Sequence, residues 1–173
     1  MCLATFLYFA YGSNLLMKRI HINNPSAVRI GVGKLKDYRL DFNYKSKRWN
    51  GAAATVVPDA GSYVWGALWE IHSDHMKTLD RQEGVSVGVY KPIIVQVEKP
   101  SGEVVQCRTY QLVNLPPALS PGESRPLERQ PSKIYLDTII EGAEESRLPD
   151  DYLKELRNIK HNGYCGPVFH NCD

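Results

Sequence analysis

Tyr8-Phe9-Ala10-Tyr11-Gly12-Ser13-Asn14-Leu15 is the stretch of sequence that decides how this chain folds. It carries an apolar, aromatic run directly into a glycine and two short polar residues. The run from Thr5 to Ala10 has the β-branched and aromatic composition of a buried strand. Leucine and isoleucine then recur at helical spacing from Leu15 to Ile20. The sequence therefore predicts a strand, a tight turn and a helix in quick succession.

The predicted turn at Gly12 suits an anionic ligand. Gly12 has no Cβ to obstruct a ligand, and backbone N–H groups at a helix start point outward at the positive end of the helix dipole. A carboxylate or a phosphate is the natural guest of such a turn. Ser13 and Asn14 are equally suited to be plain N-cap residues of a structural turn, so this motif alone leaves both interpretations open.

A second motif, Leu-Asp-Arg-Gln-Glu-Gly-Val at 79–85, closes a short helix that is predicted to begin near Ser73. Gly84 suits the left-handed conformation that ends a helix, which places Glu83 at the helix C-terminus. The unpaired carbonyl groups there disfavour a carboxylate and raise its pKa, so Glu83 is a candidate proton shuttle at neutral pH. The alternative is a solvated glutamate beside Arg81.

The chain resembles the γ-glutamylcyclotransferase family of AIG2-like cyclotransferases. The similarity extends from near Phe6 to near Val168, which is almost the whole chain. A Tyr-Gly-Ser-Asn motif combined with a later Asp-x-Gln-Glu-Gly-Val motif at this separation is far more specific than either motif alone. The matching runs are Phe6 to Leu16, His21 to Ala27, Val64-Trp65-Gly66, Leu79 to Val85 and Cys107-Arg108.

The resemblance implies an α+β fold in which a small mixed β-barrel is flanked by helices, in one domain that covers residues 1–173. It implies an enzyme of the lyase class that releases 5-oxoproline from γ-glutamyl amino acids, within glutathione metabolism and the γ-glutamyl cycle, with no cofactor. Glu83 would be catalytic. The substrate-binding residues implied by the resemblance are Tyr8, Phe9, Ala10, Tyr11, Gly12, Ser13, Tyr90, Tyr110 and Tyr135. A homodimer is a further expectation from the family.

In the implied reaction the substrate's own α-amino group attacks its γ-carbonyl, so neither a protein nucleophile nor a metal is needed. One base that later acts as an acid is sufficient, and Glu83 is the candidate for both steps. The oxyanion needs N–H or hydroxyl donors, for which backbone amides near Gly12 and a tyrosine hydroxyl are both candidates. Tyr90 and Tyr110 lie on adjacent predicted strands, where they either share a pocket wall or fill the core.

Two other functions remain open at this point. The first is a related cyclotransferase that acts on glutathione or on γ-glutamyl-ε-lysine, which would share the Gly12 turn and Glu83. The second is a catalytically silent binding protein of the same fold, which is favoured if Glu83 faces solvent or if side chains fill the pocket. The width of the pocket and the burial of Glu83 discriminate between these functions.

Composition and charge agree with one globular domain. The chain has 173 residues, of which 43% are hydrophobic and 23% are charged. Lysine and arginine number 21 and aspartate and glutamate 19, a balance that gives no electrostatic reason to expect nucleic acid as a partner. A basic patch of Lys45, Lys47 and Arg48 beside Trp49 is either a solvated loop or a surface that steers an acidic substrate.

The expected location is the cytoplasm. No apolar run approaches the roughly 20 residues of a membrane span, and the N-terminal run lacks the basic region of a signal peptide. Cys2, Cys107, Cys165 and Cys172 form no C-x-x-C pair, so reduced thiols are expected. The last two cysteines lie near histidines, but their spacing matches no structural zinc site, and no metal is expected.

The remaining elements follow from periodicity and turn residues. Hairpin turns are expected at Pro58–Gly61 and at Lys99–Gly102, and a proline-rich loop at 115–131. Two helices are expected from Ser132 to about Ser146 and from Pro149 to about Lys160, followed by a flexible tail from about residue 165. The expected strands are Thr5–Ala10, Ala27–Leu35, Tyr38–Phe42, Ala52–Val57, Tyr63–Glu70, Tyr90–Glu98 and Glu103–Val113.

Overall fold

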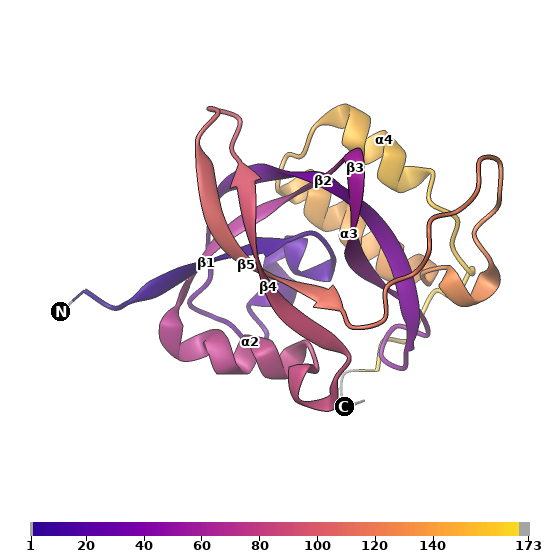
Figure 1. The fold of residues 1–173 in the computed structure, drawn as a ribbon. Helices are drawn as coiled ribbons and strands as arrows, with labels where there is room; N and C mark the ends of the chain where they lie inside the picture. The colour runs from indigo at the N-terminus through magenta and orange to yellow at the C-terminus, as the bar shows by residue number, and fades with distance from the viewer. Residues whose placement is uncertain (1, 170–173) are drawn as a thin grey trace.

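A closed barrel of five strands forms the centre of the computed structural model, which describes residues 2–169 (Figure 1). The strands are β1 Thr5–Ala10, β2 Val28–Ser46, β3 Gly51–His72, β4 Tyr90–Glu98 and β5 Val104–Leu112. Their order around the barrel is β1-β3-β2-β4-β5, and β1 closes the ring by pairing in parallel with β5, where Tyr8 faces Arg108. This barrel with its helices confirms the predicted α+β fold.

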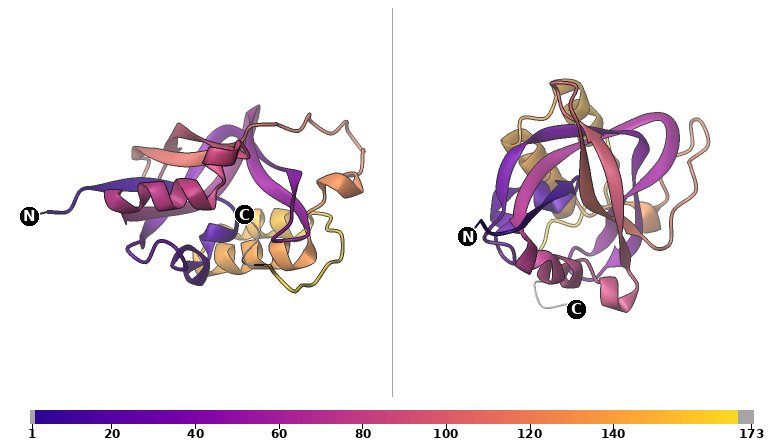
Figure 2. Two further views of the ribbon diagram at one scale, coloured as in Figure 1. Left: turned by 90° about the horizontal axis from the view of Figure 1, so that it is seen from below. Right: turned by 60° about the vertical axis from the view of Figure 1, so that its left-hand side comes forward.

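The helices of the described residues lie outside the barrel. They are η1 Ser13–Leu15, α1 Met17–Ile20, η2 Ser73–His75, α2 Met76–Gln82, η3 Val85–Val87, η4 Leu127–Arg129, α3 Lys133–Glu145 and α4 Asp150–Arg157. Figures 1 and 2 show α3 and α4 next to each other on one side of the barrel, with α2 apart from them. Among residues 2–169, no helix has the length and apolar character needed to cross a bilayer.

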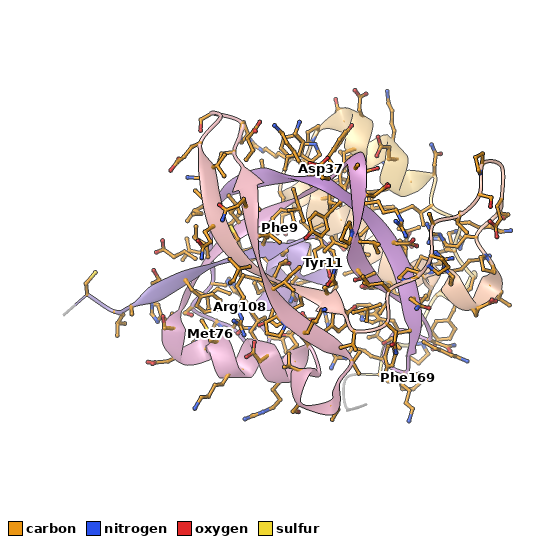
Figure 3. All side chains as sticks on the ribbon, in the orientation of Figure 1. Phe9, Tyr11, Asp37, Met76, Arg108 and Phe169 are labelled. Carbon is orange, nitrogen blue, oxygen red and sulfur yellow. The ribbon has the colours of Figure 1, made fainter. Side chains whose placement is uncertain are left out.

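Aromatic side chains from β1 and its turn occupy the middle of the molecule. Figure 3 shows Phe9 and Tyr11 inside the barrel, and Phe9 has no exposed surface. Phe9 and Tyr11 belong to a buried cluster that also includes apolar residues of α3 and α4, such as Ile139 and Leu156. The two C-terminal helices therefore cover the core, as their periodicity predicts.

The largest departure from the sequence prediction concerns β2 and β3. Each is one long strand, although the sequence predicts two shorter strands in each place. The predicted hairpin at Pro58–Gly61 is wrong, because both halves of β3 pair with β2. The register passes from Lys36 opposite Tyr63 to Tyr38 opposite Pro58, so these turn residues form a bulge in a continuing strand. The turn at Lys99–Gly102 joins β4 to β5 as predicted.

The helix predicted after the Gly12 turn is also different. A three-residue 3-10 turn, η1, is separated by extended Leu16 from α1, which has four residues. So short a helix has little dipole, because the macrodipole is a sum over aligned peptide units. The helix-dipole part of the anion-site prediction is therefore wrong, and the tight turn itself remains as the candidate anion cradle.

The loop between β5 and α3 and the chain after α4 both pack on the barrel. Arg125 and Arg129 of the loop form ion pairs with Asp41 of β2. After α4, the backbone N–H of Phe169 donates to the carbonyl of Arg48 over 3.0 Å. Residues 170–173 of the predicted flexible tail lie outside the described residues, as do its His170 and Cys172.

Candidate functional site

A cavity of about 50 Å³ lies where the Gly12 turn meets the end of α2 and the start of α3. Its lining residues are Tyr8, Tyr11, Gly12, Ser13, Asn14, Ala54, Glu83, Tyr90, Tyr110 and Tyr135. Glu83 and seven of the predicted substrate-binding residues are thus brought together from distant parts of the chain. Phe9 and Ala10 are fully buried and line the core instead of the cavity.

The Gly12 turn is closed by two backbone hydrogen bonds. Leu15 N–H donates to the carbonyl of Gly12 over 3.0 Å, and Leu16 N–H donates to the carbonyl of Ser13 over 3.2 Å. A Cβ on Gly12 would lie 3.5 Å from the hydroxyl oxygen of Tyr135 and 3.8 Å from the Cβ of Ala54. The missing side chain at Gly12 therefore leaves room on the cavity wall, as the sequence predicts.

Glu83 ends α2 and faces this cavity. Gly84 has a φ of 65°, the left-handed conformation that the sequence predicts after the helix. The residue is partly buried, and loss of hydration raises the pKa of Glu83 to about 7. Arg48 lowers this pKa and Asp80 raises it, by smaller amounts. The direction agrees with the sequence prediction, but the main cause is burial and not the helix C-terminus.

The Glu83 carboxyl group accepts no hydrogen bond from any group within residues 2–169. A carboxyl group with a pKa near 7 and free oxygens is suited to exchange protons with a bound molecule. Geometry and proton affinity thus point to the same residue.

A chain of side-chain amides holds α2 against the Gly12 turn. Asn24 Nδ2 donates to Gln82 Oε1 over 3.1 Å, and Gln82 Nε2 donates to Asn14 Oδ1 over 3.4 Å. Asn14 Nδ2 in turn donates to the hydroxyl of Tyr8 over 3.3 Å. Because Gln82 precedes Glu83, this chain of contacts positions the carboxylate beside the turn.

Asp80 organises the side of the cavity formed by β5. Arg108 donates from Nη2 to both carboxylate oxygens of Asp80, over 2.8 and 2.9 Å, and the Tyr110 hydroxyl also donates to this carboxylate. Figure 3 shows Arg108 close to α2, which carries Asp80. Sequence reasoning missed Asp80, Gln82 and Asn14 as site residues, although all three lie within the two motifs that it identified.

A larger groove of about 310 Å³ adjoins the inner cavity. Four residues line both spaces: Ser13, Glu83, Tyr90 and Tyr135. The groove also contains cationic side chains, with Lys47, Arg48 and Arg81 on its walls beside apolar groups such as those of Val87 and Val89. Part of the basic patch identified in the sequence therefore borders the site.

The described residues contain no group of three or more histidine, cysteine, aspartate or glutamate side chains arranged to hold a metal ion. The histidine and cysteine pairs considered in the tail include His170 and Cys172, which are outside the described residues. Cys165, which is within them, is an exposed free thiol.

Comparison with known proteins gives consistent matches across the chain. Residues 63–156 match the model of the AIG2-like family. The gamma-glutamylcyclotransferase of Bos taurus is 44% identical over 168 residues, covering 95% of this chain and 84% of the relative. The gamma-glutamylcyclotransferase of Homo sapiens is 41% identical over the same shares of the two chains. A solved structure of a gamma-glutamyl cyclotransferase superposes with a TM-score of 0.86 at 38% identity, covering 96% of this chain and 95% of the other.

Proposed function

This chain belongs to the γ-glutamylcyclotransferase family within the AIG2-like proteins, and we propose how its cavity carries out the family's reaction. The enzyme converts a γ-glutamyl amino acid into 5-oxoproline and the free amino acid. Glu83 moves the protons, and the Gly12 turn binds the γ-glutamyl group. One observation carries this proposal: Glu83, with a pKa of about 7, lines the same small cavity as Gly12 and Ser13.

Substrate binding solves an orientation problem. The α-amine of the substrate must curl back onto its own γ-carbonyl, and a well-oriented intramolecular reaction gains about 7 to 11 kcal/mol over its bimolecular counterpart. We assign the α-carboxylate to the turn at Gly12 and Ser13, since backbone N–H groups in tight turns bind anions. This placement leaves the α-ammonium group toward Glu83.

The protons balance around one carboxylate. The substrate's α-nitrogen begins as an ammonium group with three protons and ends in the lactam with one. The leaving nitrogen begins with one proton and ends as an ammonium group with three. Glu83 accepts each proton from the attacking nitrogen and delivers it to the departing one, which contributes about 10² to 10⁴ in rate. No water is consumed, and the new ring C–N bond replaces the original amide C–N bond.

The leaving amino acid is assigned to the outer groove. The cavity and the groove meet at Glu83, so a substrate whose glutamyl group is inside places its scissile amide at that junction. Cationic groups of Lys47 and Arg81 in the groove favour a leaving group with a free carboxylate. Glutathione and γ-glutamyl-ε-lysine also end in carboxylates, so these substrates remain alternatives to γ-glutamyl amino acids.

The silent-protein alternative is not favoured, because both of its conditions are unmet. Glu83 is partly buried at the cavity, and the cavity is not filled by side chains.

The test measures release of 5-oxoproline from γ-glutamyl-alanine, beside glutathione and γ-glutamyl-ε-lysine, with a chelator present. Glu83→Gln keeps the shape of the side chain but cannot exchange protons, so turnover should fall by at least about a hundredfold. Glu128→Gln, an exposed residue of η4, is the matched control and should retain wild-type rates. Full activity in Glu83→Gln would refute the proton-transfer role, and turnover of only glutathione or γ-glutamyl-ε-lysine would reassign the substrate.

We also propose a cytoplasmic location and a role in glutathione metabolism. Cys2, Cys107 and Cys165 are free thiols, which is the usual state of cysteine in a reducing compartment. A homodimer remains a prediction from the family resemblance, and light scattering on the purified protein tests it. Fractionation of cells that express a tagged chain tests the location.

A further inference from the structure

We propose that the hydroxyl group of Tyr135 donates the hydrogen bond that stabilises the oxyanion formed at the substrate's γ-carbonyl. This assignment rests on the reaction proposed above and specifies a role for one of its groups. It is argued from the hydrogen bonds of the cavity tyrosines, from the place where cavity and groove meet, and from the way the Tyr135 ring is held.

Three of the five cavity tyrosines donate their hydroxyl protons in hydrogen bonds to acceptors within the protein. Tyr11 donates to the carbonyl of Tyr110, and Tyr110 donates to the carboxylate of Asp80. Tyr90 donates to the carbonyl of Ala54 over 2.5 Å. A phenol has one proton to donate, so none of these three can serve an oxyanion without breaking a bond that it already makes.

Tyr135 has the opposite role in its hydrogen bond. The backbone N–H of Ala54 donates to the Tyr135 hydroxyl over 3.1 Å. A backbone N–H can only donate, so the phenol oxygen must be the acceptor and its own proton is left over. Among the residues that the structure describes, the Tyr135 hydroxyl donates no hydrogen bond. Burial raises the pKa of Tyr135, so the phenol keeps that proton at neutral pH.

Tyr8 also accepts a hydrogen bond, but it is less suited to the role. Its partner is Asn14 Nδ2, which donates to the Tyr8 hydroxyl over 3.3 Å, so the choice between Tyr8 and Tyr135 depends on their positions. Tyr8 also lines only the inner cavity, whereas Tyr135 lines both the cavity and the groove. The scissile carbonyl is expected at the junction of the two spaces, because the glutamyl group lies inside and the leaving group outside.

The junction between the cavity and the groove leaves few side chains that could donate to the oxyanion. Besides Tyr135, the residues common to both spaces are Ser13, Glu83 and Tyr90. Glu83 exchanges protons, and the proton of Tyr90 is bonded to Ala54. Ser13 is therefore the competing side-chain donor, and the experiment below includes it.

The Tyr135 ring is held rigidly, as an oxyanion donor must be. Its ring centroid lies 4.8 Å from that of Trp49 and 6.4 Å from that of Phe42. Its backbone N–H donates to the capping hydroxyl of Ser132 over 3.2 Å, which anchors the first turn of α3. Ala54 contacts two of the tyrosines through its backbone. Its N–H donates to the Tyr135 hydroxyl, and its carbonyl accepts from the Tyr90 hydroxyl.

The step needs no proton transfer from Tyr135. When the α-amine attacks, the π electron pair of the γ-carbonyl moves onto its oxygen, and the Tyr135 O–H group donates a hydrogen bond to that oxygen. When the tetrahedral intermediate collapses, the pair returns to the carbonyl and the C–N bond to the leaving amine breaks. Tyr135 ends in the state in which it began, and Glu83 carries all of the transferred protons.

The experiment compares kcat and KM for γ-glutamyl-alanine in Tyr135→Phe, Tyr90→Phe and Ser13→Ala. Loss of one oxyanion donor lowers kcat by about 10²- to 10³-fold, so this loss is expected in Tyr135→Phe with KM changed by less than about threefold. Tyr90→Phe removes a hydroxyl bonded to the same peptide and should lower kcat by less than about tenfold. A kcat within tenfold of wild type in Tyr135→Phe, or a hundredfold loss only in Ser13→Ala, would overturn the proposal.

A second measurement separates donation from structure. Fluorinated tyrosine at position 135 keeps the hydroxyl and its bond from Ala54 but makes the phenol a stronger acid, so kcat should change progressively with the number of fluorines. Fluorination at position 152, a buried tyrosine that lines neither the cavity nor the groove, is the matched control and should give no such trend. A kcat independent of fluorination at 135 would contradict the proposal even if Tyr135→Phe fails to fold. Absence of 5-oxoproline from the wild-type enzyme would instead refute the reaction on which this inference rests.

Discussion

At the scale of single residues, the proton affinity of Glu83 is the property on which the proposed chemistry depends. Desolvation brings its pKa to about 7, Arg48 opposes the increase and Asp80 adds to it. Both protonation states are therefore populated at neutral pH, which is the condition for one group to act first as base and then as acid.

The pH dependence of the reaction follows from that pKa. The base must begin as a carboxylate, so kcat/KM should fall tenfold per pH unit as the pH decreases below about 7. Asp80→Asn removes a negative charge that raises this pKa and should move the acid limb to lower pH. Arg48→Gln should move it to higher pH. Initial rates of γ-glutamyl-alanine turnover from pH 5 to 9 provide the measurement.

Asp74→Asn, at an exposed position of η2, is the matched charge control for the pH profile and should leave the acid limb unchanged. If Asp80→Asn and Arg48→Gln moved the limb in the same direction, the limb would not report Glu83.

At the scale of secondary-structure elements, the contact between α3 and the turn that follows β1 aligns the two halves of the site. Gly142 allows this close approach, because a Cβ there would lie only 2.6 Å from the Cβ of Leu15 and 2.6 Å from the backbone nitrogen of Leu16. The Ser146 hydroxyl, one turn further on, donates to the carbonyl of Leu15 over 3.3 Å. Since α3 also carries Tyr135, its distance from Gly12 depends on this contact.

Gly142→Ala should therefore reduce both stability and activity. The added methyl group has no room, so the helix must move away, at a cost of about 1 to 3 kcal/mol. We expect kcat/KM to fall by at least about tenfold, because a small displacement of catalytic groups has a large effect on rate. Denaturant unfolding and steady-state kinetics provide the two readouts.

Glu141→Ala, which precedes Gly142 on the exposed face of α3, is the control. It should change the unfolding free energy by less than about 0.5 kcal/mol and leave kcat/KM unaltered. Equal stability and activity in Gly142→Ala and wild type would show that α3 can move without disturbing the site.

At the scale of the whole molecule, a buried ion cluster joins the barrel to the long loop that precedes α3. Asp41 on β2 is 2% exposed, and its carboxylate accepts from Arg39 and from Arg129 over 3.1 and 3.0 Å, and from Arg125. Burial alone would raise the pKa of Asp41, but the hydrogen bond from Phe42 N–H and the arginines lower it below its ordinary value. Folding therefore favours the ionised form of Asp41 over the protonated form.

Asp41→Asn should be destabilising by about 3 to 5 kcal/mol at pH 7, because it leaves partly buried arginines without their buried counterion. A carboxylate whose pKa is lowered by folding contributes stability above its unfolded value of 3.8, and loses that contribution as the pH falls. The difference between wild type and variant should thus narrow below about pH 4. Urea unfolding at pH 7 and pH 3 tests this.

Turnover per folded molecule should be unchanged in Asp41→Asn, since Asp41 lines neither the cavity nor the groove. Asp59→Asn, in the bulge of β3, is the control for loss of one carboxylate and should have a much smaller effect. A stability difference that stayed constant with pH would show that the charge on Asp41 is not its cause.

The bounds of β1 and β4 were predictable to the residue, because strand composition and flanking turn residues are local properties. The bulge at Pro58–Gly61 was not, because proline and glycine mark a local bend without indicating which strand is the partner. Only the register with β2 shows that β3 continues through the bend.

The motifs along the sequence by themselves determined the family, and the family resemblance implied the barrel with its flanking helices and a site that combines the Gly12 turn with Glu83. The tertiary structure decided how the hydroxyl protons in the cavity are shared and why the pKa of Glu83 rises. The hydrogen bonds of Tyr135 and Tyr90 to Ala54 join residues distant in sequence, and burial depends on every element around a side chain. Closure of the barrel brings those groups together, so no local sequence pattern predicts these hydrogen bonds or the pKa of Glu83.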